Sequence, residues 1–367
     1  LFISSMLFVA TSCGNSWLDL EPSTSVDTET SIKILSDVEF TLNGIYSTMQ
    51  SSDAYSGRLV YYGDVTGDDM QAVSSTKRVA NYYRFNFTKD DNPSSHWSYL
   101  YSIIQNCNLI LMNIDKLVID EDDKAYRDDL KGEALAIRGL ALFDLTRIFG
   151  YPYLKDNGAS LGVPIIEGLS TIDSKPTRNT VAQCYTKIID DLTQSLSLLG
   201  EKFNKGKINK WGAMVLLSRV YLYKGENANA LKMASDAIIG AEKNKYALWT
   251  NEDYPTAWGE DASASKPGEV LFEIVNLTTD SPGKESMGYL NSYDGYDDMC
   301  ITCSFYQFLK EDPKDIRLQL LSFDKKYYAY VNKYQPQREE NIEDANIPLI
   351  RLSEAYLNAA EAAVKEN

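Results

Sequence analysis

Residues 207–240, KINKWGAMVLLSRVYLYKGENANALKMASDAIIG, carry the pattern that decides the fold. Two segments with helical spacing of apolar and small residues flank the turn YKGENAN, which contains Gly225. In the first segment, the small residue Ser218 would let the second helix approach, and Tyr221 would fill the angle between the two helices. Alanines in the second segment permit a close crossing. The stretch therefore predicts a tightly packed helical pair.

The spacing within this pair matches the large, small, aromatic and alanine positions of a tetratricopeptide repeat. A second segment near the end of the chain, LIRLSEAYLNAAEAAVKEN, repeats the first-helix spacing and is counted from Leu349. The two copies are far apart, so the repeats are not in simple tandem and a large insertion separates them. The matching positions are Met214, Leu217, Ser218, Tyr221, Gly225, Ala230, Ala234 and Ala237, and then Leu349, Leu352, Ser353 and Tyr356.

Three further segments show helical periodicity, namely 97–114, 131–149 and 180–199. Gly150 and Pro152 end the second, and Asn179 or Thr180 could cap the third. Asp190 and Asp191 adjoin the apolar stripe of the third helix and are expected on its solvated face. The expected core-facing residues are Leu100, Ile103, Ile104, Cys107, Leu111 and Ile114; Leu135, Arg138, Leu142, Leu145 and Phe149; and Val181, Tyr185, Ile188, Leu192 and Leu196.

The segment 244–348 has a different character, because Gly, Pro, Ser, Asp and Tyr punctuate it. Short strands are expected at EVLFEIV, from Glu269, and at YYAYVNKY, from Tyr327. The predicted fold is mainly α, a scaffold of tetratricopeptide-like helical pairs with an irregular, loop-rich insertion that carries a few short strands. The expected organisation is a signal segment 1–12, an anchor and tether 13–30, a helical portion 31–243, the insertion 244–348 as the ligand-binding part, and the start of a final helical pair at 349–367.

The start of the chain predicts where the protein resides. Twelve uncharged residues precede Cys13, too few to span a bilayer but enough for the apolar region of an export signal. Ala10, Thr11 and Ser12 are all small, as in a bacterial lipobox, in which the cysteine is diacylated and becomes the new N-terminus. An ordinary apolar N-terminus with a buried cysteine is the alternative. We expect a lipid anchor at Cys13, followed by an acidic tether.

The charge and the aromatic content limit the kinds of partner. With 36 Lys and Arg against 52 Asp and Glu, the net charge of -16 argues against nucleic acid and against an electrostatic hold on anionic lipid. A neutral or cationic ligand fits better. The 25 Tyr are an unusual number, and their rings can sit half exposed with a polar tip in water. Some of these rings are therefore candidates for a binding surface.

No cofactor is expected. Cys300 and Cys303 have the spacing of half a zinc site, but no second pair follows and the single histidine, His96, is distant in sequence. The two are expected to be thiols, a redox disulfide being the alternative, and Cys107 and Cys184 are expected in the core. The alternating oxygen ligands of the segment DVTGDD, 64–69, are compatible with Ca²⁺. The segment nevertheless lacks a glycine at the sixth position and the final glutamate of an EF-hand loop.

Several segments in order resemble the SusD/RagB family of nutrient-binding outer-membrane lipoproteins of Bacteroidota. The resemblance implies a helical core with tetratricopeptide-like pairs, a variable ligand-binding half, and a SusC-like TonB-dependent transporter over which the lipoprotein sits as a lid. Family members usually continue past SEAYLNAAEA, so a fragment at both ends is expected. The segments are WLDLEPST, LNGIYSTM, GDVTGDDM, WSYLYSIIQNCNLIL, KGEALAIRGLALFDLTRIFGYPYL with GVPII, TVAQCYTKIIDDL, WGAMVLLSRVYLYKG and IPLIRLSEAYLNAAEA.

Aromatic residues interleaved with polar ones mark the candidate ligand contacts, because rings stack on the apolar faces of sugars while Asp, Asn and Arg bind hydroxyls. Two clusters and a tryptophan pair fit this description, although packing between loops would explain any one of these residues equally well. The family's ligand contacts vary, so none is carried over. The candidates are Asp69, Arg78, Asn81, Tyr82 and Tyr83; Tyr289, Asn291, Tyr293 and Tyr296; and Trp249 and Trp258.

These observations predict a surface-exposed outer-membrane lipoprotein that captures an oligosaccharide and passes it on unchanged. A protein-interaction scaffold of the tetratricopeptide type, or a binder of a peptide or other non-glycan nutrient, is the alternative. An enzyme is not expected, because His96 opens a helix with no nucleophile motif nearby. A glycoside-cleaving enzyme, which needs only two carboxylates, is the third interpretation.

Overall fold

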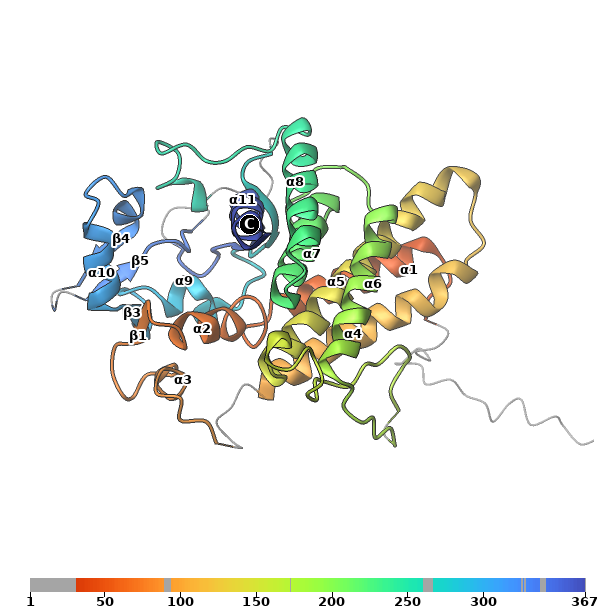
Figure 1. Ribbon diagram of the computed structural model, residues 1–367, viewed down its shortest axis with the longest axis horizontal. Helices are drawn as coiled ribbons and strands as arrows, with labels where there is room; N and C mark the ends of the chain where they lie inside the picture. Colours follow the sequence, from red (N-terminus) through yellow and green to blue (C-terminus); the bar gives the residue numbers. More distant parts are fainter. Residues whose placement is uncertain are drawn as a thin grey trace, which may run out of the picture.

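The structure is a computed structural model of the chain, and it describes residues 31–88, 94–171, 173–259, 267–324, 326, 328–336 and 341–366. One half of the molecule consists of packed helices, and the other consists of loops, short helices and small sheets (Figure 1). This architecture confirms the predicted mainly helical fold class. The predicted signal segment, Cys13 and the tether lie outside the described residues.

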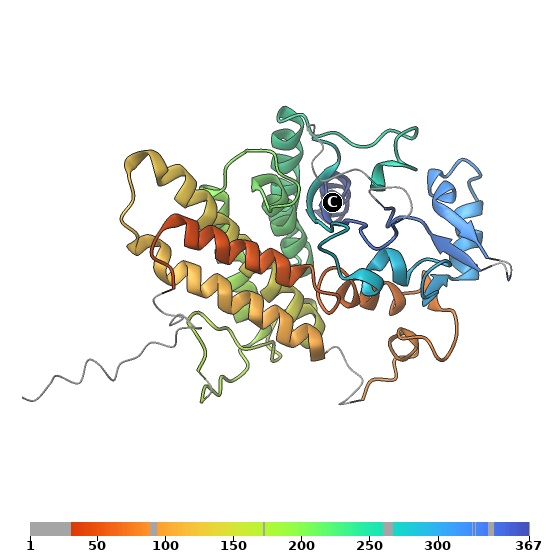
Figure 2. The same cartoon turned by 180° about the vertical axis from the view of Figure 1, so that it is seen from behind.

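The helical half contains α1 (Leu35–Met49), α4 (Ser94–Asn113), α5 (Lys124–Phe149) and α6 (Val181–Leu198). Figure 2 shows α1 alongside α4, with α5 packed against both. The three predicted helices are confirmed, although α5 begins seven residues before the predicted start at residue 131. The predicted cap is Thr180, whose hydroxyl accepts a hydrogen bond from the backbone N–H of Gln183.

Asp191 corrects the sequence interpretation, because it is fully buried rather than on a solvated face. Its two carboxylate oxygens accept hydrogen bonds of 2.8 and 2.6 Å from the guanidinium of Arg138. Arg138 also donates to the side-chain oxygen of Asn108 at 2.8 Å. The neighbouring Asp190 is exposed as predicted. The Arg138–Asp191 pair joins α5 to α6, because α5 covers the side of α6 that carries Asp191.

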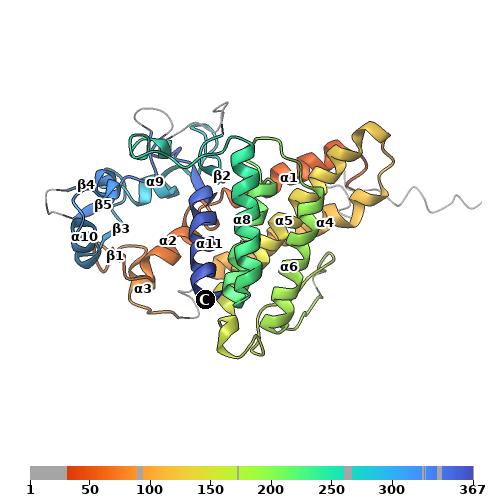
Figure 3. The same cartoon turned by 45° about the horizontal axis from the view of Figure 1, so that its top comes forward.

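The pair of helices predicted at residues 207–240 is confirmed as α7 (Lys210–Lys224) and α8 (Asn227–Lys243). Gly225 ends α7 with a φ of 82°, a left-handed conformation that glycine adopts without strain. A third helix, α11 (Leu352–Glu366), lies beside α8 in Figure 3 and also packs on α7. Ser218, the small residue of the predicted repeat, contacts this helix, because the Asn358 amide donates to its hydroxyl at 2.8 Å.

The sheets of the loop-rich half are two-stranded and antiparallel. β2 (Val270–Ile274) confirms the predicted strand and pairs with β6 (Ile347–Arg351). Leu349, assigned from helical spacing to the last helix, lies in β6 instead, because Ile347 and Ile350 pair with β2. The other pairs are β1 (Met70–Ala72) with β3 (Met299–Ile301) and β4 (Leu321–Phe323) with β5 (Ala329–Val331), the last shorter than the predicted 327–334.

Pairing of β1 with β3 places the segment around residues 58–83 in the loop-rich half, whereas the sequence grouped it with the helical portion. The short helices of this half are α2 (Arg58–Val65), α3 (Ala80–Tyr83), α9 (Met287–Leu290) and α10 (Cys303–Lys310). Short 3₁₀ helices lie at Ile114–Lys116, Glu121–Asp123, Tyr153–Lys155, Ala257–Gly259, Gly283–Glu285 and Ile316–Leu320.

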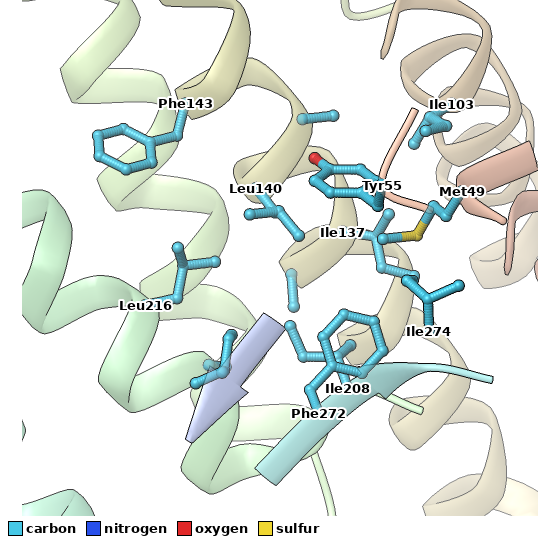
Figure 4. Packing of buried hydrophobic residues seen from close by; sticks show 14 of the residues in the cluster. Met49, Tyr55, Ile103, Ile137, Leu140, Phe143, Ile208, Leu216, Phe272 and Ile274 are labelled. Carbon is cyan, nitrogen blue, oxygen red and sulfur yellow. The ribbon is translucent and has the colours of Figure 1, made fainter. Parts of the chain in front are cut away.

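A continuous apolar core joins the two halves. Figure 4 shows Met49, Ile137, Phe272 and Ile274 packed together, so that α1 and α5 contact β2. Cys107 and Cys184 are buried in this core, as predicted. The candidate binding loops are therefore mounted on a rigid base, as is usual for binding sites built from loops.

Candidate ligand-binding site

Two segments that are distant in sequence meet at one surface, and both were predicted to bind ligand. The guanidinium carbon of Arg78 lies 3.9 Å from the centre of the Tyr296 ring. The Tyr296 ring in turn makes an edge contact with Tyr289, with ring centres 4.9 Å apart. We call these three residues, with Tyr293 from the loop between the two tyrosines, the Tyr296 cluster. Arg78 and Tyr293 are exposed, whereas Tyr289 and Tyr296 are half-buried.

The loop between Tyr289 and Tyr296 is shaped by its backbone. The Ser286 hydroxyl caps α9 by accepting from the N–H of Tyr289, and the N–H of Tyr296 donates to the Tyr289 carbonyl at 3.0 Å. Gly295 permits this return, since a Cβ there would lie 2.0 Å from the Tyr289 carbonyl oxygen. The glycine thus explains how two tyrosines seven residues apart bring their rings together.

Charged groups fix Arg78 in place. Its guanidinium lies 3.1 Å from a carboxylate oxygen of Asp298 and 3.2 Å from one of Glu285. Burial raises the pKa of Asp298 above its usual range, although Arg78 opposes this rise. Beside it, the Lys77 ammonium donates to the Tyr296 carbonyl at 2.5 Å. The position of Arg78 is therefore set before any ligand arrives.

Tyr293 adds an exposed ring. Its side chain is 46% exposed, and its ring is 6.3 Å from that of the buried Tyr330. The hydroxyl of Tyr330 donates to Asp297, and burial, followed by that carboxylate, raises the pKa of Tyr330 well above its usual range. The exposed Tyr293 ring therefore lies near a buried ring that is itself held in place by a hydrogen bond.

Tyr82 and Tyr83 belong to a second group of rings. The Tyr82 ring contacts Tyr61, Tyr62 and Phe87 at centre distances of 5.5 to 6.1 Å and is half-buried, so much of it packs between loops. Tyr83 is 37% exposed. Asn81 is half-buried, and Asp69, the residue before β1, is exposed. Among these, Tyr83 and Asp69 remain accessible candidates.

Two predicted contacts are buried instead. Trp258 is 3% exposed, because its ring packs against Trp249 and Tyr254 and lies under the cations of Lys333 and Arg351. Asn291 is also 3% exposed, and its amide donates to the Val331 carbonyl. Neither side chain is therefore part of the exposed surface. Trp249 is half-buried in the same tryptophan cluster.

Sequence reasoning missed the residues that support these rings, Lys77, Glu285, Asp298 and Tyr330. Arg78 and its partner Asp298 are 220 positions apart, and no local pattern connects them. The two adjacent aspartates in YDDM indicate a polar segment, but the sequence does not show which cation they would pair with. Lys333 was also missed; burial, and then the charge of Arg351, lowers its pKa to about 8.

His96 is buried, and one of its ring nitrogens lies 3.1 Å from the Asp53 carbonyl oxygen. Within the described ranges, no group of three or more His, Cys, Asp or Glu side chains is arranged to hold a metal ion. Cys300 is buried and Cys303 exposed, both as free thiols. Of the helices described, none is both long and apolar enough to cross a bilayer.

Comparison with known proteins identifies the family. A SusD-like family model, described as starch-binding and associating with the outer membrane, matches residues 16–222. SusD-like protein P2 of Formosa agariphila is 27% identical over 305 residues, which are 80% of this chain but only 56% of that protein, so the chain spans little more than half its length.

Two crystal structures from Bacteroides vulgatus share the fold. A putative sugar binding protein is 83% identical with a TM-score of 0.90, over 92% of this chain and 75% of that one. A SusD superfamily protein is 37% identical with a TM-score of 0.85, over 92% and 77% of the two chains. The family match and these likenesses together show that the chain belongs to the SusD-like family.

Proposed function

We propose that this protein is a cell-surface lipoprotein that binds an oligosaccharide and delivers it, chemically unchanged, to a SusC-like TonB-dependent transporter of the outer membrane. The observation that carries the proposal is the Tyr296 cluster, in which Arg78 and two tyrosines from distant segments form one surface. The family description and the 83% identical protein from Bacteroides vulgatus, described as a putative sugar binding protein, support a glycan as the ligand.

The physical match is between an aromatic surface and a sugar ring. A sugar offers C–H faces, which stack on tyrosine rings, and hydroxyls, which pair with guanidinium and carboxylate groups. The exposed Tyr293 supplies such a ring, and Arg78 supplies directed donors. Because Arg78 is already held by Asp298 and Glu285, binding costs little of its conformational entropy.

The lipid anchor at Cys13 and the transporter are parts of the same proposal. Two acyl chains would hold the protein stably at the membrane, since one chain alone binds marginally. Purification of the lipidated protein from its native membrane should recover a large TonB-dependent barrel. Recovery of a different complex, together with no binding to any glycan, would favour the protein-interaction scaffold instead.

The binding experiment uses the soluble chain starting after Cys13 on a panel of neutral and acidic glycans. We expect binding without release of reducing sugar. Tyr293→Ala should weaken the affinity by about tenfold, or about 1.4 kcal/mol. The matched control is Tyr126→Ala, which removes an exposed ring at the start of α5 in the helical half. Equal losses for both variants, with unchanged helicity, would overturn the assignment of the site.

A further inference from the structure

Two adjacent carboxylates beside the Tyr296 cluster have different surroundings. Asp298 is buried, and the guanidinium of Arg78 lies 3.1 Å from one of its oxygens. The side chain of Asp297, the residue before it, is 33% exposed. Of these two groups, only Asp297 therefore presents a carboxylate that a ligand can reach.

Asp297 is held in place by its backbone and by one of its two oxygens. Its φ is 56°, a left-handed conformation that is unfavourable for a residue with a Cβ atom. Its N–H donates to the Ser292 carbonyl at 3.1 Å, and its Oδ1 accepts from the hydroxyl of the buried Tyr330. Strained backbone retained by such contacts is concentrated at binding sites. The carboxylate is thus oriented before a ligand arrives.

The second oxygen of Asp297, Oδ2, is left for another group. It lies 3.6 Å from the ammonium of Lys77, which is too long for a hydrogen bond. It makes no hydrogen bond within the described part of the chain, and it is not one of the polar atoms that are buried without a partner, so it contacts solvent. A ligand can therefore reach this oxygen directly.

Lys77 supplies a donor beside this oxygen. Its ammonium has three N–H groups, one of which donates to the Tyr296 carbonyl at 2.5 Å, and its side chain is 23% exposed. The pair differs from Lys232 and Asp236 on α8, where ammonium and carboxylate lie 2.6 Å apart and satisfy one another. In the Lys77–Asp297 pair, by contrast, a donor and an acceptor both remain for a third group.

The chemistry of the pair suits a group that both accepts and donates a hydrogen bond. Two atoms 3.6 Å apart can each lie about 2.8 Å from one shared oxygen. A hydroxyl would accept from the ammonium and donate to the carboxylate, whereas an ionised carboxyl could only accept and an ammonium could only donate. An ion of either sign would also be repelled by one member of the pair. A hydroxyl therefore fits best.

Both exposed residues of the cluster lie close to the pair. Lys77 is next to Arg78 in the chain. Tyr330, whose hydroxyl bonds to Asp297, has its ring centre 6.3 Å from that of Tyr293. A sugar ring stacked on the exposed tyrosine would therefore bring its hydroxyls near the pair.

We propose that Lys77 and Asp297 form a binding site for a sugar hydroxyl, which accepts a hydrogen bond from the ammonium and donates one to Oδ2 of the carboxylate. The inference rests on the proposed function, because this hydroxyl belongs to the oligosaccharide held by the Tyr296 cluster. It adds two specificity-determining residues and one requirement of the ligand, a free hydroxyl. A methyl ether at the same position could accept but not donate, and should bind more weakly.

The direct test is a crystal structure of the protein soaked in concentrated glucose. We expect one glucose hydroxyl oxygen within hydrogen-bond distance of both the Lys77 nitrogen and Oδ2 of Asp297. Glucose on Tyr293 with only water at the pair, or water alone in both places, would overturn the hydroxyl site.

Solution binding on the glycan panel tests the two residues together. Asp297→Asn, which keeps an oxygen for the Tyr330 hydroxyl, and Lys77→Met should each weaken binding by about tenfold on the glycan that the parent binds most tightly. The double variant should bind about as weakly as either single variant, since both act on one hydroxyl. The matched controls Lys232→Met and Asp236→Asn, in the closed pair on α8, should leave binding unchanged.

The outcomes separate this inference from the proposed function. If the parent binds a glycan and the Asp297→Asn and Lys77→Met variants, folded by circular dichroism, bind it equally well, the hydroxyl site is overturned and the proposed function stands. Losses that multiply in the double variant would show that the two residues do not share a hydroxyl, and would also overturn the site. No binding of the parent to any glycan would overturn both.

Discussion

Replacing Asp191 by Leu should destabilise the fold by about 3–5 kcal/mol, because it strands a buried charge. The substitution leaves the Arg138 guanidinium without the two hydrogen bonds of 2.8 and 2.6 Å that neutralise it. It also removes a carboxylate 3.2 Å from the Lys187 ammonium. Lys187 keeps Glu167 at 2.7 Å, so Arg138 bears most of the loss.

The double variant Arg138→Met with Asp191→Leu distinguishes charge from packing. It removes both ions and fills the site with apolar side chains, a change that is often neutral for buried pairs. One polar group remains unpaired, since the Asn108 oxygen loses its donor, at a cost of about 1–3 kcal/mol. The double variant should therefore be more stable than Asp191→Leu alone.

Urea denaturation followed by circular dichroism measures these differences. The control is Asp190→Asn, at an exposed neighbour whose ion pair with Lys187 is 3.9 Å long, and it should change stability by less than about 0.5 kcal/mol. If Asp191→Leu stays within about 1 kcal/mol of the parent, or if the double variant is as unstable as the single one, the buried charge is not what holds α5 to α6.

Two further predictions concern the scaffold. Burial raises the pKa of Glu133 to about 7, so between pH of about 4.3 and 7 the folded state binds more protons and stability should fall as pH rises. Glu133→Gln should flatten that part of the urea stability profile; an unchanged slope would contradict the shift. Gly225→Ala should cost about 1–2 kcal/mol, because φ is 82° and the new Cβ would lie 2.8 Å from a Leu154 methyl. A melting temperature equal to that of the parent would refute the strain.

The scaffold was predictable because its signals are local. Helical periodicity, the hydroxyl of Thr180 and the glycine after α7 each act within one or two turns of chain. The close crossing of α7 and α8 follows from alanines that recur at fixed spacing, and Ala230, Ala234 and Ala237 are all buried. The same spacing also pointed to α11, whose start it placed a few residues too early, within β6.

The sequence-based predictions were wrong where burial or strand pairing depends on residues far away in the sequence. Asp190 and Asp191 differ by one residue, or about 100° around the helix, and only the position of Arg138 on α5 decides that one is buried. Strand β1 has three residues, too few for any period, and its partner is about 230 positions away. Its segment was therefore grouped with the wrong half.

The candidate site depends both on local sequence signals and on contacts with distant residues. Composition drew attention to tyrosines mixed with polar residues, yet the same composition selected both Trp258, which is buried under two cations, and Tyr293, which is exposed. Aromatic residues serve the core and a binding surface equally well, so their identity cannot choose between these roles. What separates these roles is whether other segments cover the ring, and Trp258 is covered by Lys333, which follows β5, and by Arg351, at the end of β6.

This dependence also suggests how one scaffold can present different surfaces. The loops of the site are joined by three two-stranded sheets and by side-chain bonds such as Asn291 to Val331. The helical core, by contrast, is stabilised by its own apolar contacts and by the Arg138–Asp191 pair. Substitutions at Tyr293 or Lys77 leave that core untouched, so affinity and specificity can change there at little cost in stability, which is why the binding variants proposed above should fold.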